Sequence, residues 1–368
     1  MIVNGRVVTP DGIVEGHVRV DGDRIAEVGG GDPGGGLLVP GFVDIHNHGG
    51  GGFSFTTGDA DAARGAAAFH LRHGTTTLLA SLVSSPYELM RAATQAFAPL
   101  VREGVLAGVH FEGPYLSPAR CGAQNPAYLR DPSLDELTEL IAIGGGAVRM
   151  MTLAPERDGA LDAIGLLVDK HVVAAVGHTD ATYDQTLQAV AAGASVATHL
   201  CNAMRPVHHR EPGPIVALLA AETVVCELIA DGVHLHDGML GFAATTAGAD
   251  RIALVTDATD ATGMPDGAYE LGGQSVIVAD RVARLATADG SPGSIAGSTL
   301  TMDAALRRAV AAGASIVDAA RMAATTPARV LGLSEVLGCL TPGRRADLVE
   351  LDAELNVTRV MRAGAWVA

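Results

Sequence analysis

The sequence predicts an α/β protein built on a (β/α)₈ TIM-like barrel, with a small β-sandwich formed from both ends of the chain. Three observations support this prediction. The chain has 368 residues, enough for one barrel of about 250 residues and a smaller appendage. A unit of an Ala/Leu-rich helix, a glycine and a short apolar strand repeats along its middle. Strand and turn patterns occupy both ends of the sequence.

The two ends of the chain are expected to fold together. The first forty residues contain short strands joined by Asp-Gly turns, and these strands are too few to be stable alone. Residues Arg345–Ala368 again alternate strand, turn and strand, so they are the expected partner. We therefore assign residues 1–40 and 338–368 to the small β-sandwich domain and residues 41–337 to a catalytic barrel domain.

Eight apolar segments between these ends are the candidate barrel strands. They are Phe42–His46, Thr76–Val83, Gly108–Glu112, Val148–Leu153, Val172–His178, Ser195–His199, Cys226–Ala230 and Ile252–Asp257. An insertion at Ala268–Ala286 is expected to form an extra hairpin. An open doubly wound sheet is the structural alternative, but the GxGxxG turn of such sheets is missing, because Gly49–Phe53 has no such register.

Composition and charge exclude several classes of protein. The formal net charge is −16 and Lys/Arg residues do not cluster, so we expect no nucleic acid and no anionic membrane as a partner. No apolar run reaches the ~18 residues of a membrane span, and no secretory signal is visible. The cysteines lack CxxC spacing and are expected to be reduced thiols of a cytoplasmic protein. They are Cys121, Cys201, Cys226 and Cys339.

Metal-ligating side chains gather where the predicted strands end. His46 and His48 are two residues apart in an extended segment, so they point the same way and can hold one ion. Glu112 ends the third strand and is expected to be a ligand or a base; as a ligand, its carboxylate can bind one cation with each oxygen. His178 and His199 end the fifth and sixth strands. Because the carboxyl ends of barrel strands meet at one face, these residues form a mixed N/O set suited to Zn²⁺ or Fe²⁺.

Asp257, at the end of the eighth strand, is the predicted general base. A cation lowers the pKa of a bound water towards neutrality, and a neighbouring carboxylate can remove its proton. His110 lies on the same strand as Glu112 and is expected to support a ligand or to pack in the core. Cys121 lies in a Gly/Pro-rich loop that could close over the site. No base stands beside it in the sequence, so we do not expect a nucleophilic cysteine.

These residues resemble the amidohydrolase superfamily, through the DIHNH end of the first strand, the histidines of the fifth and sixth strands, and the aspartate of the eighth. Within it, seven motifs in order are similar to the N-acetylglucosamine-6-phosphate deacetylase family: HFEGPYLSP, GHTDATY, THLCNAMRP, REPG, DGVH, LVTDA and IAGSTLTMDAAL. The resemblance covers nearly the whole chain. It implies a hydrolase that converts N-acetyl-D-glucosamine 6-phosphate to D-glucosamine 6-phosphate and acetate in amino-sugar catabolism or recycling.

The resemblance also implies a site for two divalent metals. Many superfamily members bridge their metals with a carboxylated lysine of strand four, but Lys170 is the only lysine here and precedes the fifth strand, so Glu112 would be the bridge. The expected metal is Zn²⁺, with Fe²⁺, Mn²⁺ and Co²⁺ as alternatives that such ligands accept. The two ligand sets would be Glu112, His178 and His199 for one metal, and His46, His48, Glu112 and Asp257 for the other.

The implied mechanism uses a hydroxide held by the metals as the nucleophile. Asp257 would take the proton of the water as base and then return it as acid to the sugar nitrogen.

Substrate contacts and a homodimer follow from the same resemblance. It assigns the sugar phosphate to Asn202, the backbone at Ala203 and His234. It places Arg210 in the site of the neighbouring subunit. Gln124 stands where the family usually has a histidine, and its amide can donate a hydrogen bond to a substrate oxygen but cannot carry charge.

Two other interpretations remain open at this point. Another amidohydrolase, acting on a cyclic amide or an N-acyl amino acid, would use the same metal ligands but leave Arg210, His234 and Asn202 without a role. A non-catalytic protein that binds metal or sugar phosphate is disfavoured, because Asp257 and the complete ligand set are present.

Overall fold

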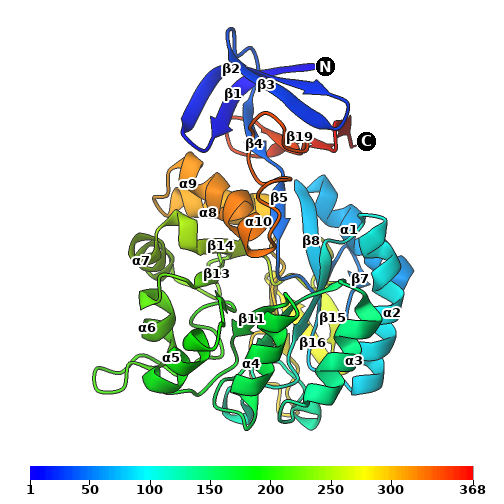
Figure 1. Ribbon diagram of the computed structural model, residues 1–368, viewed down its shortest axis with the longest axis vertical. Coiled ribbons are helices and arrows are strands. Elements are labelled where there is room, and N and C mark those ends of the chain that lie inside the picture. The colour runs from blue at the N-terminus through cyan, green and yellow to red at the C-terminus, as the bar shows by residue number, and fades with distance from the viewer. Residues whose placement is uncertain (368) are drawn as a thin grey trace.

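The computed structural model describes residues 1–367 and shows an α/β barrel with a small β-domain at one end (Figure 1). Ala368, the last residue of the predicted C-terminal strand segment, lies outside the described residues. The predicted fold class is confirmed.

Eight parallel strands form the barrel sheet, in the order β14-β13-β12-β11-β10-β9-β8-β5. Nearly every residue in them is buried, as expected for parallel strands that helices cover on the outer face and side chains fill on the inner face. Their bounds are β5 Phe42–Asp44, β8 Thr75–Leu82, β9 Gly108–Glu112, β10 Val148–Leu153, β11 Val173–Val176, β12 Val196–Ala197, β13 Val225–Ile229 and β14 Ile252–Val255.

Each barrel strand is followed by a helix on the outside of the barrel (Figure 1). These helices are α1 Ala60–Arg72, α2 Tyr87–Arg102, α3 Leu134–Gly144, α4 Ala160–Asp169, α5 Tyr183–Ala191, α6 Gly213–Ala220, α7 Asp237–Ala247 and α8 Met302–Ala311. The short helices α9 (Ile316–Ala320) and α10 (Thr326–Val330) then lead back to the small domain. The repeated strand and helix unit of the sequence is therefore the repeating unit of the barrel.

Four predicted strands end two residues earlier than expected, at Asp44, Val176, Ala197 and Val255. For three of them, the reason lies in the backbone of the residues that follow. His178, His199 and Asp257 have φ values of 46°, 29° and 50°, in the left-handed region, which turns the chain out of the ladder. These three candidate site residues therefore lie just beyond the strands, whereas Glu112 is the last residue of β9.

The barrel closes between its edge strands β5 and β14 through residues beyond their ends. The Asp257 N–H donates to the His46 carbonyl at 2.9 Å, and the His48 N–H donates to the Ala258 carbonyl at 2.8 Å. Closure therefore joins the two predicted site segments directly.

A buried carboxylate on β5 stabilises this closure. Asp44, on β5, accepts hydrogen bonds from the Thr256 hydroxyl at 2.6 Å and from the Asn47 amide at 2.9 Å. The Thr256 backbone N–H also donates to it, at 3.2 Å. Burial raises the pKa of Asp44, and these hydrogen bonds act in the opposite direction.

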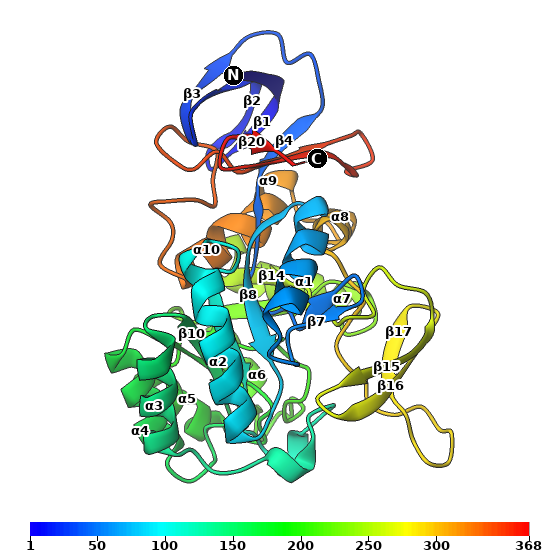
Figure 2. The same ribbon diagram turned by 90° about the vertical axis from the view of Figure 1, so that its right-hand side faces the viewer.

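The insertion after β14 contains one strand more than the predicted hairpin. It is an antiparallel sheet of β15 (Gly267–Leu271), β16 (Gln274–Ala279) and β17 (Val282–Leu285), seen at the side of the barrel in Figure 2. The second turn, Asp280-Arg281, has positive φ values at both residues, as a two-residue hairpin turn requires. Because this turn lacks the glycine that usually marks a two-residue hairpin, it was not predicted from the sequence.

Both ends of the chain share one seven-stranded sheet, in the order β20-β19-β18-β4-β1-β2-β3 (Figure 2). Its core contains buried residues from both ends, such as Val7, Val18, Leu348 and Met361. The boundaries of the two domains, residues 1–40 with 338–368 and residues 41–337, remain a prediction. The strands are β1 Ile2–Thr9, β2 Gly12–Asp21, β3 Arg24–Gly30, β4 Leu37–Pro40, β18 Leu348–Leu351, β19 Val357–Arg362 and β20 Ala365–Trp366.

Among residues 1–367, no helix is both long enough and apolar enough to cross a membrane. All four cysteines are described by the structure, and all are free thiols.

The closure of the barrel can be tested with Thr256→Val. This change removes the hydroxyl donor of Asp44 and leaves a buried acceptor with fewer partners, so the free energy of unfolding should fall by about 1–3 kcal/mol. Thr94→Val is the matched control, because the Thr94 hydroxyl donates only to the Met90 carbonyl of its own helix. Urea titrations measure both variants. Equal losses in the two would show that the Asp44 contact has no special role in stability.

Candidate metal centre

A cavity of about 270 Å³ opens at the carboxyl ends of the barrel strands. Most of the site residues predicted from the sequence line this cavity. The residues that line it are His48, Val83, Glu112, Gly122, Ala123, Gln124, His178, His199, Asn202, Ala203, His234, Asp257, Leu271, Ser294, Ile295 and Gly297. His46 lies behind this lining and is fully buried.

His46 and His48 point their Nε2 atoms at each other across 3.1 Å. The Nδ1 atom of His46 is 2.9 Å from a carboxylate oxygen of Glu227, and that of His48 is 3.1 Å from the Ser81 carbonyl. Since these oxygens accept hydrogen bonds, each Nδ1 carries the hydrogen, so in the neutral rings each Nε2 has the lone pair. Two lone pairs therefore face one another.

A second pair of histidines meets on Glu112. One carboxylate oxygen, Oε1, lies 2.9 Å from Nε2 of His178 and 2.9 Å from Nε2 of His199. The two Nε2 atoms are 3.2 Å apart. The Nδ1 atom of His178 donates to the Arg120 carbonyl at 3.0 Å, whereas that of His199 has no partner among residues 1–367. The Nε2 atoms of both rings therefore face the same oxygen, Oε1 of Glu112.

The donor atoms fit a divalent metal. Ligand atoms in each of two groups, His46 with His48 and Glu112, and Glu112 with His178 and His199, lie within 4.8 Å of one another. Tetrahedral Zn²⁺ with ligands at 2.0–2.1 Å separates its ligand atoms by about 3.3 Å. The nitrogen separations in both groups are close to this value. Facing lone pairs repel unless a cation or a proton lies between them, so both groups suit a bound cation.

The electrostatics of the cluster also favour positive charge. Burial alone would lower the pKa of His48, but hydrogen bonds and charge from Asp257 and Glu112 outweigh it and raise that pKa to about 9. Burial would conversely raise the pKa of both carboxyl groups, and the surrounding histidines hold the pKa of each below its ordinary value. The buried carboxylates thus stabilise a cation at this position.

Asp257 stands between the histidine pair and the cavity. Its Oδ1 atom lies 3.2 Å from Nε2 of His48 and 3.5 Å from Nε2 of His46. Its backbone is held on both sides, by the His46 carbonyl and by the Ser298 N–H. The side chain therefore reaches both the candidate ligands and the space where a ligand molecule would lie.

His110 supports the centre without lining the cavity. Its Nδ1 and Nε2 atoms lie 2.9 Å from the hydroxyls of Ser81 and Thr152, and its ring packs edge to face on His46. Burial lowers the pKa of His110 well below its ordinary value, so the ring is neutral. This agrees with the prediction that it packs behind a ligand.

Both polar atoms of the Gln124 amide form hydrogen bonds within the protein. Its Nε2 atom donates to Oε2 of Glu112 at 2.6 Å, and its Oε1 atom accepts from the Ser84 N–H at 2.7 Å. The sequence predicts a substrate contact for Gln124, and in the structure its amide anchors the loop to Glu112, a candidate metal ligand. An amide can do so because it has a donor and an acceptor at the same end. A substrate contact remains a prediction.

The other predicted substrate residues are divided in space. Asn202, Ala203 and His234 line the cavity. Asp231 accepts from Nδ1 of His234 at 2.7 Å, which leaves Nε2 for a ligand. Burial would raise the pKa of Asp231, but the contact with His234 outweighs it and lowers that pKa.

Arg210 does not line this cavity. It lies on an exposed loop, and its Nη1 atom is 2.8 Å from a ring nitrogen of His209. The chain therefore does not supply Arg210 to its own site in this conformation.

Lys170 is excluded from the centre, as the sequence analysis expected. It is an exposed residue that ends α4, just before β11 begins. The metal groups stand beyond the opposite, carboxyl end of β11.

Two residues of the site were not predicted from the sequence. Glu227 binds His46, and Asp231 binds His234. A glutamate inside the apolar strand Val225–Ile229 is a signal that could have identified the first. The spacing of Asp231 and His234 in DGVH could have identified the second. Leu271 of the insertion also lines the cavity, as do Ser294 and Ile295, which follow the insertion in the chain; none of the three has a metal-ligating or titratable side chain that would mark it in the sequence.

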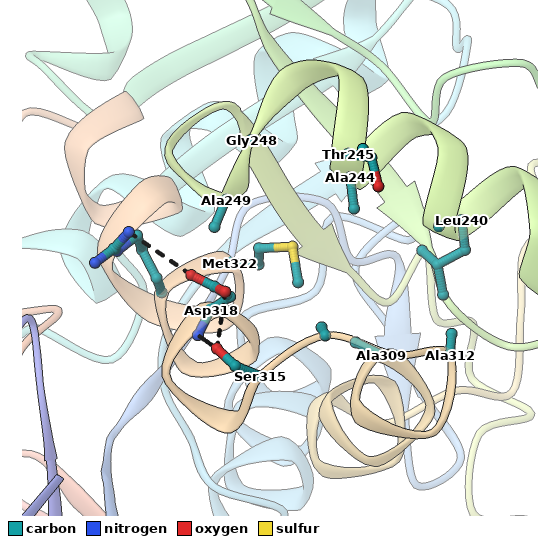
Figure 3. A pocket seen from close by; sticks show the side chains of 14 residues that line it. Leu240, Ala244, Thr245, Gly248, Ala249, Ala309, Ala312, Ser315, Asp318 and Met322 are labelled. Carbon is teal, nitrogen blue, oxygen red and sulfur yellow. Dashed lines mark hydrogen bonds and ion pairs between the residues drawn. The ribbon is translucent and has the colours of Figure 1, made fainter. Parts of the chain in front are cut away.

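A larger cavity, of about 330 Å³, lies between α7, α8 and α9 (Figure 3). It is bordered by the last residues of α7, just before β14 begins, and so lies at the opposite end of the barrel. Its lining is mostly small and apolar, and Asp318 pairs with Ser315 and Arg321 (Figure 3). It holds neither of the two candidate metal groups.

Comparison with known proteins agrees with this geometry. Residues 37–367 match the model of the amidohydrolase family. The chain is 46% identical to N-acetyl-D-glucosamine-6-phosphate deacetylase from Mycobacterium smegmatis, solved as a mutant in complex with N-acetyl-D-glucosamine-6-phosphate; the match covers 100% of this chain and 98% of the other, with a TM-score of 0.95.

Two curated bacterial relatives match most of the chain. An N-acetylgalactosamine-6-phosphate deacetylase of Escherichia coli O157:H7 is 39% identical over 89% of this chain and 87% of its own length. An N-acetylglucosamine-6-phosphate deacetylase of Lysinibacillus sphaericus is 37% identical over 89% of this chain and 84% of its own. The chain belongs to the amidohydrolase family and, within it, to the N-acetylglucosamine-6-phosphate deacetylases and their relatives.

Proposed function

We propose that the protein is a metal-dependent hydrolase that removes the acetyl group from N-acetyl-D-glucosamine 6-phosphate, giving D-glucosamine 6-phosphate and acetate. The observation that carries this proposal is the set of histidines and carboxylates gathered at one cavity, in a chain whose relatives bear this name. The catalytic unit would be the barrel, residues 41–337, and the reaction would serve amino-sugar catabolism or recycling.

The centre would hold two divalent metals, with Zn²⁺ as the first candidate and Fe²⁺, Mn²⁺ or Co²⁺ as alternatives. Such metals polarise a carbonyl oxygen and make a bound water acidic at neutral pH. Glu112 would be shared between the two ligand groups, because its Oε1 faces His178 and His199 while its Oε2 lies 3.3 Å from Nε2 of His48. The Gln124 amide holds that second oxygen in place.

Asp257 would move the proton. Its carboxylate stands beside the ligand histidines and lines the cavity, within reach of both an attacking water and the amide nitrogen of a bound sugar. It would accept the proton of the water and release it to the nitrogen that leaves. The same group can serve in both steps, because one proton enters and leaves it in each turnover.

Recognition of the phosphate would come from both subunits of a homodimer. His234, held by Asp231, and Asn202 with the backbone at Ala203 would bind it from the chain's own cavity. Arg210 would reach the neighbouring site, in keeping with its exposed loop and its distance from its own cavity lining. A cationic contact is needed because the chain carries a net charge of −16, which repels a phosphate dianion. We place the enzyme in the cytoplasm, since four free thiols suit a reducing compartment.

A second substrate has specific support. The relative with 39% identity is an N-acetylgalactosamine-6-phosphate deacetylase, and the two sugars differ only in the configuration of one ring hydroxyl. Acetate release from both phosphorylated sugars and from unphosphorylated N-acetylglucosamine tests the proposal. We expect the highest kcat/KM for N-acetylglucosamine 6-phosphate. No acetate from either phosphorylated sugar would refute the proposed function.

Asp257→Asn should remove nearly all turnover while substrate binding stays measurable. The change deletes the proton carrier and keeps the shape, and such groups contribute about 10²–10⁴-fold. Acetate release measures kcat, and calorimetry measures binding. Asp260→Asn, the same substitution three residues away, is the control. Turnover of Asp257→Asn within about threefold of wild type would remove Asp257 from the proposed role.

Glu112→Gln should lose metal, because one carboxylate serves both ligand groups. Metal analysis after dialysis should find fewer ions per chain than in wild type. Glu136→Gln, in which the affected carboxylate binds Tyr115 and Arg130 instead, should keep its metal. Bicarbonate should give the metal-depleted wild type no rescue beyond that of metal alone, since no carboxylated lysine is involved. Two ions bound to Glu112→Gln at normal affinity would show that the bridge is misassigned.

Arg210→Ala should lower kcat/KM for the phosphorylated sugar by roughly 10–150-fold, the worth of a charge-assisted hydrogen bond of about 1.5–3 kcal/mol. The unphosphorylated sugar should be little affected, and His209→Ala on the same loop should change both substrates by less than about threefold.

Mixed dimers test whether Arg210 acts across the interface. Arg210→Ala chains mixed with Asp257→Asn chains should form dimers with one intact site and one doubly damaged site. Their activity should exceed that of either parent. If subunit exchange is confirmed and activity does not recover, Arg210 acts within its own chain.

A further inference from the structure

Glu227 is a carboxylate buried in the middle of an apolar strand. It lies on β13, flanked by Cys226 and Leu228, and its exposed fraction is 0%. An ionised carboxylate in such surroundings is costly unless charge and hydrogen bonds compensate it. Within residues 1–367, no lysine or arginine forms an ion pair with it, and His46 is its only ion-pair partner.

The contacts of Glu227 converge on the metal centre. Its Oε2 atom accepts from Nδ1 of His46 at 2.9 Å and from the backbone N–H of His199 at 3.1 Å. Its Oε1 atom has no partner in the described part of the chain. One carboxylate oxygen therefore contacts a ligand of each of the two candidate metal groups.

We propose that Glu227 is a positioning residue that sets the metal affinity of the His46 and His48 group. By accepting from Nδ1, it fixes the tautomer in which Nε2 of His46 points its lone pair at the cation. Its negative charge makes that nitrogen a stronger donor. The cation bound by His46 in turn compensates the buried charge of Glu227. This inference rests on the metal centre proposed above.

The contact with His199 does not explain the arrangement by itself. A backbone N–H needs only a neutral acceptor, which a glutamine or a carbonyl would supply at a smaller desolvation cost. A charged group is useful where the partner is an imidazole that must bind a cation. The geometry at His46 therefore accounts for the carboxylate.

The experiment compares wild type with Glu227→Gln, which keeps the size of the side chain and removes its charge. Competition with a chelator, followed by metal analysis, gives the affinities of the first and second Zn²⁺ ions. We expect one ion to bind about 10–100-fold more weakly in the variant, as for other residues that orient metal ligands, and the other to change by less than about threefold. Cys226→Ala is the matched control, because its side chain leaves the same strand on the opposite face.

A double-mutant cycle shows whether Glu227 acts through His46. In a His46→Ala background, Glu227→Gln should not weaken binding of the remaining ion further. Additive losses, or equal losses at both ions, would assign Glu227 a general structural role and overturn the inference. An unchanged affinity in Glu227→Gln would also overturn it.

Histidine ¹⁵N resonances of the metal-loaded wild type provide a readout that needs no variant. They should show the hydrogen of His46 on Nδ1, and a hydrogen on Nε2 would overturn the inference. If the wild-type chain binds fewer than two ions, the binuclear centre itself is refuted, and the proposed role of Glu227 is refuted as well. Failure of the two proposals is thus distinguishable.

Discussion

The closure of the barrel between β5 and β14 is the constraint on which the rest of the site depends. Two backbone hydrogen bonds join His46 to Asp257 and His48 to Ala258, beyond the last residues of both strands. They bring together segments that are more than 200 residues apart in the chain. Buried Asp44 holds Thr256 and Asn47 beneath them, so the position of the histidine pair relative to Asp257 is fixed by the same contacts that close the sheet.

Left-handed backbone at the strand ends then directs the side chains. His178, His199 and Asp257 all adopt positive φ, which costs free energy for residues with a Cβ. Such strain persists only where surrounding contacts hold it, and here the neighbouring strands of a closed barrel do so. The functional consequence is that three side chains from three strands turn towards one cavity instead of alternating across the sheet.

Buried carboxylates give the centre its charge. Glu112 lies at the contact of the two histidine groups, and Glu227 lies behind them. Gln124 links Glu112 to the loop whose residues Gly122 and Ala123 also line the cavity, so the position of this loop and the position of a candidate ligand oxygen are coupled. A cation in the centre would therefore also affect stability. Each buried carboxylate costs folding free energy unless a positive charge, such as a cation bound by the histidines, compensates it.

The amino-acid pattern alone was enough to predict the fold class, the pairing of the chain ends and a set of candidate ligand residues that the structure brings together. Periodic strands and helices report burial, and histidines and acids at strand ends stand out against apolar runs. Four features became visible only in the folded chain: the ends of the strands, the hydrogen bond between Gln124 and Glu112, the hydrogen bond between Glu227 and His46, and the position of Arg210 away from its own cavity. These features depend on φ angles and on contacts between residues distant in sequence. Local patterns do not encode them, because the partner that satisfies a buried polar group is chosen by the closed barrel.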